Sequence, residues 1–139
     1  MKIYIAAPLF CEKEKAFNEK VDAILREYGH ETYLPQRDAG SVADLPAFIN
    51  GVPSRIHVFR EDCRHMDWCD ICLILIDGRV PDEGAVFELG YCYHAGKRCV
   101  GYQTDSRWFI GIFNNAMLEG ALEKVLYDEK QLREFFSAV

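Results

Sequence analysis

The chain has 139 residues, with 16 Lys and Arg against 22 Asp and Glu, which gives a formal net charge of −6. This balance excludes a general nucleic-acid-binding protein, because affinity for nucleic-acid phosphates comes from clustered positive charge. Half of the residues are hydrophobic, which is enough for the core of a single domain over 1–139, and the apolar runs are too short to cross a membrane.

The N-terminal third alternates predicted strands and helices. Residues 2–7 predict a strand rich in Ile and Tyr that ends at Pro8. Apolar residues at helical spacing predict a helix over 12–28, and a short strand is expected over 31–34. Residues 36–50 contain several Gly and Pro turn formers and predict a loop or short helical pieces.

The same alternation continues to the C-terminus. A helix is predicted over 54–68, and it leads to a strand over 71–76 that contains no polar residue. Such a run is typical of a strand buried on both faces of a parallel sheet. The rest of the chain predicts, in order, a loop over 77–84, a helix over 85–95, a strand over 98–102, a loop over 104–120, a short strand over 124–127 and a helix over 129–136.

Strands that alternate with helices form parallel sheets, because each crossover helix returns the chain to the same end. We therefore predict an α/β fold with a flavodoxin-like five-stranded parallel sheet, helices on both faces, and the first and third strands adjacent. Ligands of such sheets bind beyond the carboxyl ends of the strands. This rule indicates two loops, 8–11 and 77–84, and predicts that Phe10, Asp77 and Gly84 contact a substrate.

The six cysteines are interpreted as reduced thiols, because the chain has an ordinary core and no basic, apolar leader; we expect a cytoplasmic protein. Cys69 and Cys72 form a CxxC pair, which is compatible with zinc. However, Cys72 lies inside the apolar strand, and no second pair with metal-ligand spacing accompanies it. We expect core cysteines, and neither a metal nor an organic cofactor.

Glu88 is the one carboxylate in the segment 85–95, which is apolar nearly all round and predicts a helix packed on most sides. On a helix it shares a face with small residues, among them Gly84 and Cys92. A carboxylate in such surroundings is costly unless it is hydrogen-bonded or used in chemistry. The alternative is a surface glutamate, or one held by a structural partner.

Three further residues accompany Glu88 as candidates. Asp82 precedes the helix, where a helix N-cap is its alternative role. Asp62 lies on the helix before the third strand, where a solvated surface charge is the alternative. Tyr4 lies in the first strand and is predicted to be buried, with a hydroxyl that needs a partner. If the first and third strands are neighbours, this hydroxyl reaches the Glu88 carboxylate; the alternative is an ordinary core tyrosine.

These residues also carry a resemblance to a known family. The matching segments are IYIAAPLF at 3–10, Asp62 eight residues before Asp70, DEGAVFELGY at 82–91, and the shorter pieces Gly96-Lys97, Gly101-Tyr102, Thr104-Asp105 and Asn115-Ala116-Met117. Together they look like the nucleoside 2-deoxyribosyltransferase family, over nearly the whole chain. The specific part is the Asp-x-Gly-x-x-x-Glu-x-Gly segment.

The resemblance implies that 2-deoxyribosyl groups are exchanged between nucleobases, with 2'-deoxynucleosides and free bases as partners. It implies that Glu88 is the nucleophile, that Asp82 contacts and helps to protonate the base, and that Tyr4 orients Glu88. It also implies that Asp62 binds the deoxyribose hydroxyls or assists at the base. Asn115 and Met117 would complete the site of a neighbouring subunit, so homo-oligomers with shared active sites are expected.

The chemistry suits these groups, because cleavage of an N-glycosidic bond builds positive charge on the sugar and negative charge on the base. An ionised Glu88 forms a glutamyl-deoxyribosyl intermediate, and a second base then releases it. One rival is a 2'-deoxynucleoside 5'-monophosphate N-glycosidase, a hydrolase in which water replaces the second base. Arg37, Arg79 and Arg107 are its candidate phosphate ligands. Another rival is a non-catalytic nucleotide-binding domain.

Overall fold

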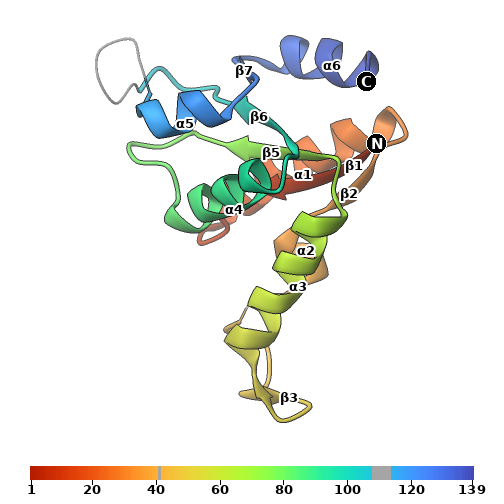
Figure 1. Cartoon of the computed structure of the whole chain (residues 1–139), viewed down its shortest axis with the longest axis vertical. Helices are drawn as coiled ribbons and strands as arrows, with labels where there is room; N and C mark the ends of the chain where they lie inside the picture. The colour runs from red at the N-terminus through yellow and green to blue at the C-terminus, as the bar shows by residue number, and fades with distance from the viewer. Residues whose placement is uncertain (41, 108–113) are drawn as a thin grey trace.

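Five parallel strands form the centre of the structure, a computed structural model that describes residues 1–40, 42–107 and 114–139 (Figure 1). In sheet order the strands are β2 (Glu31–Tyr33), β1 (Lys2–Ala6), β5 (Ile71–Leu75), β6 (Arg98–Tyr102) and β7 (Lys124–Leu126). All neighbouring pairs run parallel. Counted along the chain, the order is 2-1-3-4-5, which is the flavodoxin-like order. The predicted fold and the adjacency of the first and third strands are confirmed.

Helices cover both faces of this sheet. On one face, α1 (Glu12–Glu27) and α6 (Glu129–Ser137) pack through residues such as Leu25 and Phe136. On the other face lie α3 (Ser54–Trp68), α4 (Glu83–His94) and α5 (Ala116–Ala121), whose buried contacts include Met66, Leu89 and Leu118. Every residue of β5 is buried, as expected for a strand that is apolar on both faces. No helix in the described part of the chain is long and apolar enough to span a membrane.

The prediction that α4 is packed on most sides is wrong for the single chain. Its inner residues Ala85, Leu89 and Cys92 are buried, but Phe87 and Tyr93 are 54% and 58% exposed. One stripe of α4 covers the sheet, and the remaining apolar side chains look outward because no described element of this chain covers them.

Two regions contain regular structure beyond what the sequence predicts, which is a loop or short helical pieces over 36–50 and a loop over 104–120. Within 36–50, α2 (Pro35–Asp38) is followed by β3 (Phe48–Ile49), which pairs antiparallel with β4 (Val52–Pro53). The turn between them is Asn50-Gly51, and both residues have positive φ, as a tight hairpin turn requires. Within 104–120, the helix α5 begins where the Asn115 side chain accepts a hydrogen bond from the backbone N–H of Met117.

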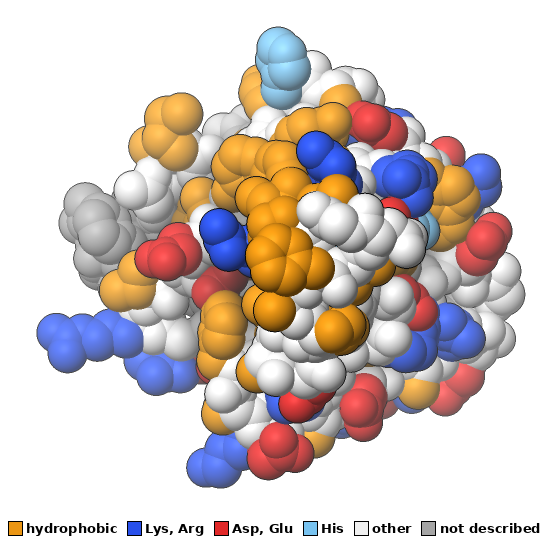
Figure 2. All heavy atoms as spheres, turned by 90° about the horizontal axis from the view of Figure 1, so that it is seen from below, with side chains coloured by type: hydrophobic (Ala, Val, Ile, Leu, Met, Phe, Trp, Pro, Cys, Tyr) orange, Lys and Arg blue, Asp and Glu red, His pale blue; other side chains and the backbone are white. Residues whose placement is uncertain are grey.

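A projecting arm is formed by β3, β4 and α3, with β3 at its far end (Figure 1). Its elements carry exposed hydrophobic side chains, namely Phe48, Ile56 and Phe59. Figure 2 views the molecule from this end and shows hydrophobic side chains grouped on the surface.

Candidate active site

Tyr4 and Glu88 form a hydrogen-bonded pair between the sheet and α4. Tyr4 lies in β1, next to the central strand β5, and has no exposed surface. Its hydroxyl donates to Oε1 of Glu88 at 2.8 Å. The predicted contact between these two side chains is therefore confirmed. It joins residues 84 positions apart in the sequence, because β1 and α4 meet only in the folded chain.

A second tyrosine–carboxyl pair lies beside the first. Tyr33 of β2 donates its hydroxyl to Oδ1 of Asp62 at 2.9 Å, and Asp62 belongs to α3. Tyr33 stands opposite Tyr4 in the register between β1 and β2, and their rings stack with centroids 5.3 Å apart. The structure thus brings Tyr4, Glu88 and Asp62 into one cluster. Asp62 is not a fully solvated helix charge.

Burial changes the acidity of both carboxyl groups in this cluster. Removal from water raises the pKa of Glu88 to about 8; the charges of Asp62 and Asp82 add to the effect, and the hydrogen bond from Tyr4 opposes it. Burial likewise raises the pKa of Asp62 to about 6, against the hydrogen bond from Tyr33. Two neighbouring carboxyls that titrate close to neutral pH are typical of sites that handle protons or develop charge.

Asp82 and Gly84 form the beginning of α4, one turn before Glu88. The Asp82 carboxylate caps the helix by accepting from the backbone N–H of Ala85 at 2.9 Å, so its alternative role as N-cap is confirmed. A Cβ atom on Gly84 would lie 3.0 Å from Oδ2 of Asp82. The glycine therefore leaves room for the capping carboxylate, whose charge also acts on Glu88.

Asp77 and Phe10 lie in the two predicted crevice loops, but they differ in their surroundings. Asp77 accepts from the backbone N–H groups of Thr104 and Asp105 and from the Thr104 hydroxyl. Its carboxylate therefore joins the loops after β5 and β6. Phe10 follows β1 and is 77% exposed. The hydrogen bonds at these two residues do not connect them to the Tyr4–Glu88 pair.

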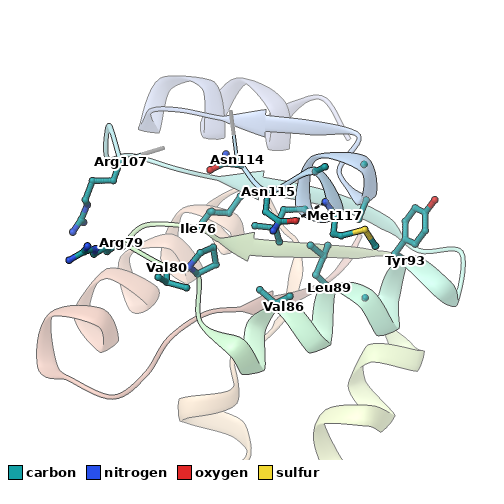
Figure 3. A pocket seen from close by; sticks show the side chains of 17 residues that line it. Ile76, Arg79, Val80, Val86, Leu89, Tyr93, Arg107, Asn114, Asn115 and Met117 are labelled. Carbon is teal, nitrogen blue, oxygen red and sulfur yellow. Dashed lines mark hydrogen bonds between the residues drawn. The ribbon is translucent and has the colours of Figure 1, made fainter. Parts of the chain in front are cut away.

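A cavity of about 630 Å³ lies between α4 and α5 (Figure 3). We call it the α4–α5 groove. Its lining is mostly apolar and includes Val86, Leu89 and Tyr93 of α4. Asn115 and Met117 belong to this groove rather than to the carboxyl cluster, and none of Tyr4, Asp62, Asp82 and Glu88 lines it. The carboxyl cluster is the better candidate for chemistry, because no carboxylate is among the described residues that line the groove.

The three candidate phosphate ligands have different environments. Arg37 is bound by the carboxylates of Asp22 and Asp38, and Arg107 is paired with Asp105. Arg79 has no ion pair within residues 1–40, 42–107 and 114–139 and lines one end of the α4–α5 groove, near Arg107 (Figure 3).

Four of the six cysteines are core residues, whereas Cys63 is partly exposed and Cys11 is exposed, so the expectation of core cysteines is wrong for these two. Cys69 and Cys72 are both buried, and Cys72 lies within β5. In the part of the chain that the structure describes, no group of three or more His, Cys, Asp and Glu side chains is arranged to hold a metal ion.

Tyr33 and His65 were not identified as site residues by the sequence patterns. The ring of His65 stacks on that of Tyr33 with centroids 3.7 Å apart. Tyr33 lies in the short predicted strand, and its sequence neighbours give no indication of Asp62, which is 29 positions away. The aromatic residues 108, 109 and 113, which are candidates for base stacking or a subunit contact, lie outside the described residues.

Fold and site together define a flavodoxin-like α/β protein with two partly buried tyrosine–carboxyl pairs on the adjacent strands β1 and β2. The nucleoside 2-deoxyribosyltransferase family model matches residues 3–132, and the chain belongs to this family. No curated protein gave a significant match.

Solved structures with the same fold include three that span nearly the whole chain. A 2-deoxyribosyltransferase of Bacillus psychrosaccharolyticus is 28% identical with a TM-score of 0.79, over 96% of this chain and 90% of that one. A 2-deoxyribosyltransferase of Leishmania mexicana is 20% identical, with a TM-score of 0.72 over 99% and 97%. A CMP N-glycosidase of Clostridium botulinum is 17% identical, with a TM-score of 0.62 over 97% and 98%, and shares the fold.

Proposed function

We propose that this protein transfers the 2-deoxyribosyl group between nucleobases in two displacements, with net retention at the sugar carbon. The observation that carries the proposal is Glu88, a half-buried carboxyl group held by the hydroxyl of Tyr4 in a chain of this family. The 28% identical transferase of Bacillus psychrosaccharolyticus adds support for this reaction.

In the first displacement, a carboxylate oxygen of Glu88 bonds to C1' of the deoxynucleoside while the C1'–N bond breaks. The electron pair of that bond leaves with the base, which takes up a proton with the assistance of Asp82. A deoxyribosyl ester on Glu88 remains. In the second displacement, a nitrogen of an incoming base attacks C1', the ester C–O bond breaks, and its electron pair returns to Glu88. The incoming base loses a proton, and no metal or organic cofactor takes part.

The surroundings of Glu88 fit a nucleophile that works near neutral pH. Its pKa of about 8 makes it a stronger base than an ordinary carboxylate, and the Tyr4 hydroxyl stabilises the ionised form. We assign to Asp62 the binding of the deoxyribose hydroxyl, which donates a hydrogen bond to a carboxylate oxygen of Asp62. Phe10 and Asp77, in the loops after β1 and β5, and Gly84, in the first turn of α4, are assigned to substrate binding.

We also propose that the active protein is a homo-oligomer in which Asn115 and Met117 reach the site of a second copy. Met117 is 83% exposed at the start of α5, and the apolar α4–α5 groove beside it remains open in the single chain. Sedimentation of the purified protein is expected to give an oligomer. Met117→Ala is expected to raise KM without changing the unfolding of the isolated chain. A monomer with full activity would contradict this proposal.

The central test is exchange between a 2'-deoxynucleoside and a free base of another kind. Glu88→Ala is expected to abolish the exchange, whereas Glu83→Ala, which changes an exposed carboxylate on the same helix, is expected to leave it intact. A 2-fluoro-substituted nucleoside is expected to leave an adduct on Glu88 that mass spectrometry detects. Near-normal exchange by Glu88→Ala would refute the assignment.

The same assay separates the transferase from the hydrolase. A transferase forms the new nucleoside only when the second base is present, while a monophosphate N-glycosidase releases base from a deoxynucleoside 5'-monophosphate without any acceptor. Arg79 is the cation to replace if monophosphates prove to be the better substrates, because it has no ion pair among the described residues.

A further inference from the structure

The ring of Tyr33 stacks with two other rings and lies beside the carboxyl group of Asp62. Tyr33 is 3% exposed, with the Tyr4 centroid 5.3 Å away and the His65 centroid 3.7 Å away. Both stacks are nearly parallel, with interplanar angles of 28° and 11°. These two stacking contacts and the burial of the side chain restrict the ring, so the direction of its hydroxyl group is restricted as well.

The two tyrosines are placed by the sheet and not by the helices. Tyr4 and Tyr33 are register partners on adjacent parallel strands, so they project from the same face. Tyr4 donates to Glu88 of α4, and Tyr33 donates to Asp62 of α3. Because neighbouring strands are about 4.8 Å apart, the two tyrosines hold carboxyls from separate helices close enough for the Asp62 charge to act on Glu88.

We propose that Tyr33 is a positioning residue of the transfer reaction, whose hydroxyl holds Asp62 beside Glu88 in the orientation that binds substrate. This role rests on the proposed function, and it deepens that function by assigning a second tyrosine to the site. The family resemblance assigned a role to Tyr4 and to Asp62 but none to Tyr33.

Electrostatics gives the tyrosine a second effect on the same carboxyl group. Burial raises the pKa of Tyr33, so its hydroxyl keeps its proton and always acts as a donor. The groups that face Asp62 are Tyr33 of β2, Tyr4 of β1, Glu88 of α4, and Glu61, Cys63 and His65 of its own helix. Of these, the Tyr33 hydrogen bond and His65 favour the carboxylate form of Asp62, and Glu61 opposes it.

Removing the Tyr33 hydroxyl therefore disturbs Asp62 in two ways. The carboxyl loses the donor that fixes its direction, and its pKa rises further because a donor to the ionised form is gone. A protonated or misdirected Asp62 is a poorer acceptor for a deoxyribose hydroxyl. The defect is expected in substrate binding more than in the chemical step, because Glu88 keeps its own tyrosine.

The test compares Tyr33→Phe, which keeps the ring and its stacking, with the wild type and with Tyr102→Phe. Tyr102 is a matched control, because it is also buried in the sheet, 4% exposed, but on the opposite face. Tyr33→Phe is expected to raise KM for the deoxynucleoside about tenfold with a smaller change in kcat, as for the loss of one hydrogen bond to a charged group. Tyr102→Phe is expected to keep the wild-type KM.

A double-mutant cycle distinguishes positioning from mere packing. If Tyr33 acts through Asp62, the double variant has nearly the same KM as Asp62→Ala alone. If the two residues act independently, the KM increases of the two single variants multiply in the double variant. The side-chain carboxyl carbon of Asp62, followed by NMR in the ligand-free protein, is expected to titrate at higher pH in Tyr33→Phe. Wild-type KM and an unchanged titration in Tyr33→Phe would overturn the inference. Absence of base exchange in the wild type would instead overturn the proposed function.

Discussion

Replacing Tyr4 with Phe removes the hydroxyl that donates to Glu88 and keeps the ring that fills the core. The hydrogen bond measures 2.8 Å, and it favours the ionised form of a carboxyl whose pKa burial has raised to about 8. Since the nucleophile must be ionised, kcat/KM of the wild type is expected to rise with pH up to about 8 and then level off.

The size of the expected pH shift follows from the charge on Glu88, the acceptor of this hydrogen bond. A hydrogen bond to a charged group contributes about 1.5–3 kcal/mol, and about 1.4 kcal/mol corresponds to one pH unit. Tyr4→Phe is therefore expected to move the acid limb of the profile upward by about one to two pH units. At pH 7 the loss in kcat/KM is expected to be about tenfold to a hundredfold, and it narrows at alkaline pH as Glu88 ionises.

The measurement is kcat/KM for base exchange from pH 5 to 10, because this ratio reports the groups of the free enzyme. Tyr102→Phe is again the control for the loss of a buried phenol hydroxyl on the other face of the sheet. An acid limb at the wild-type position in Tyr4→Phe would show that Tyr4 does not set the ionisation of Glu88. A loss of activity that is equal at every pH would refute the electrostatic reasoning.

Three further outcomes are expected. Asp62 and Glu88 have folded pKa values of about 6 and about 8, above their ordinary 3.8 and 4.5, so the unfolded chain releases these protons first. The contribution of these two groups to the free energy of unfolding is therefore expected to fall as pH rises from about 4 to about 8, which a comparison of wild type and Glu88→Gln measures. Glu88→Gln is then expected to stabilise the protein at pH 9 by about 1–3 kcal/mol in urea unfolding. A less stable variant at pH 9 would contradict the inference that burial of the ionised Glu88 carboxylate costs free energy. At the start of α4, Asp82→Ala is expected to cost about 1 kcal/mol of stability, whereas Asp82→Asn keeps the cap and loses exchange activity; equal stability of the two variants would argue against capping. Gly101→Ala is expected to cost about 1–3 kcal/mol, because its Cβ would lie 2.8 Å from Cδ1 of Ile76 and 2.9 Å from Cδ1 of Leu122; an unchanged Tm would contradict this packing.

Local patterns predicted most of the secondary structure and the strand order. The wholly apolar segment 71–76 became the central strand β5, and helical spacing placed α1, α3 and α6 within a few residues of their bounds. The hairpin at Asn50-Gly51 was missed, although its dipeptide is a strong local signal for a two-residue turn. The helix α5 was missed because six residues carry too little periodicity to stand out.

The candidate site was predicted in part, through residues whose type conflicts with their surroundings. Glu88 stood out as a lone carboxylate in an apolar helix, and Tyr4 as a tyrosine in a buried strand, and these two do form a pair. The α4–α5 groove and the exposure of Phe87 could not be predicted in this way, because the sequence does not distinguish an apolar residue that is buried from one that is exposed.

The sequence by itself determined the alternation of strands and helices, the central buried strand and the isolated acid at position 88, since each depends on neighbours within a few residues. Only the tertiary structure decided that Tyr33 donates to Asp62 and stacks on Tyr4. That arrangement arises from the register between β1 and β2 and from the packing of α3 over them. Contacts between distant segments have no local pattern, because the sheet, and not the spacing along the chain, sets the distance between the two tyrosines.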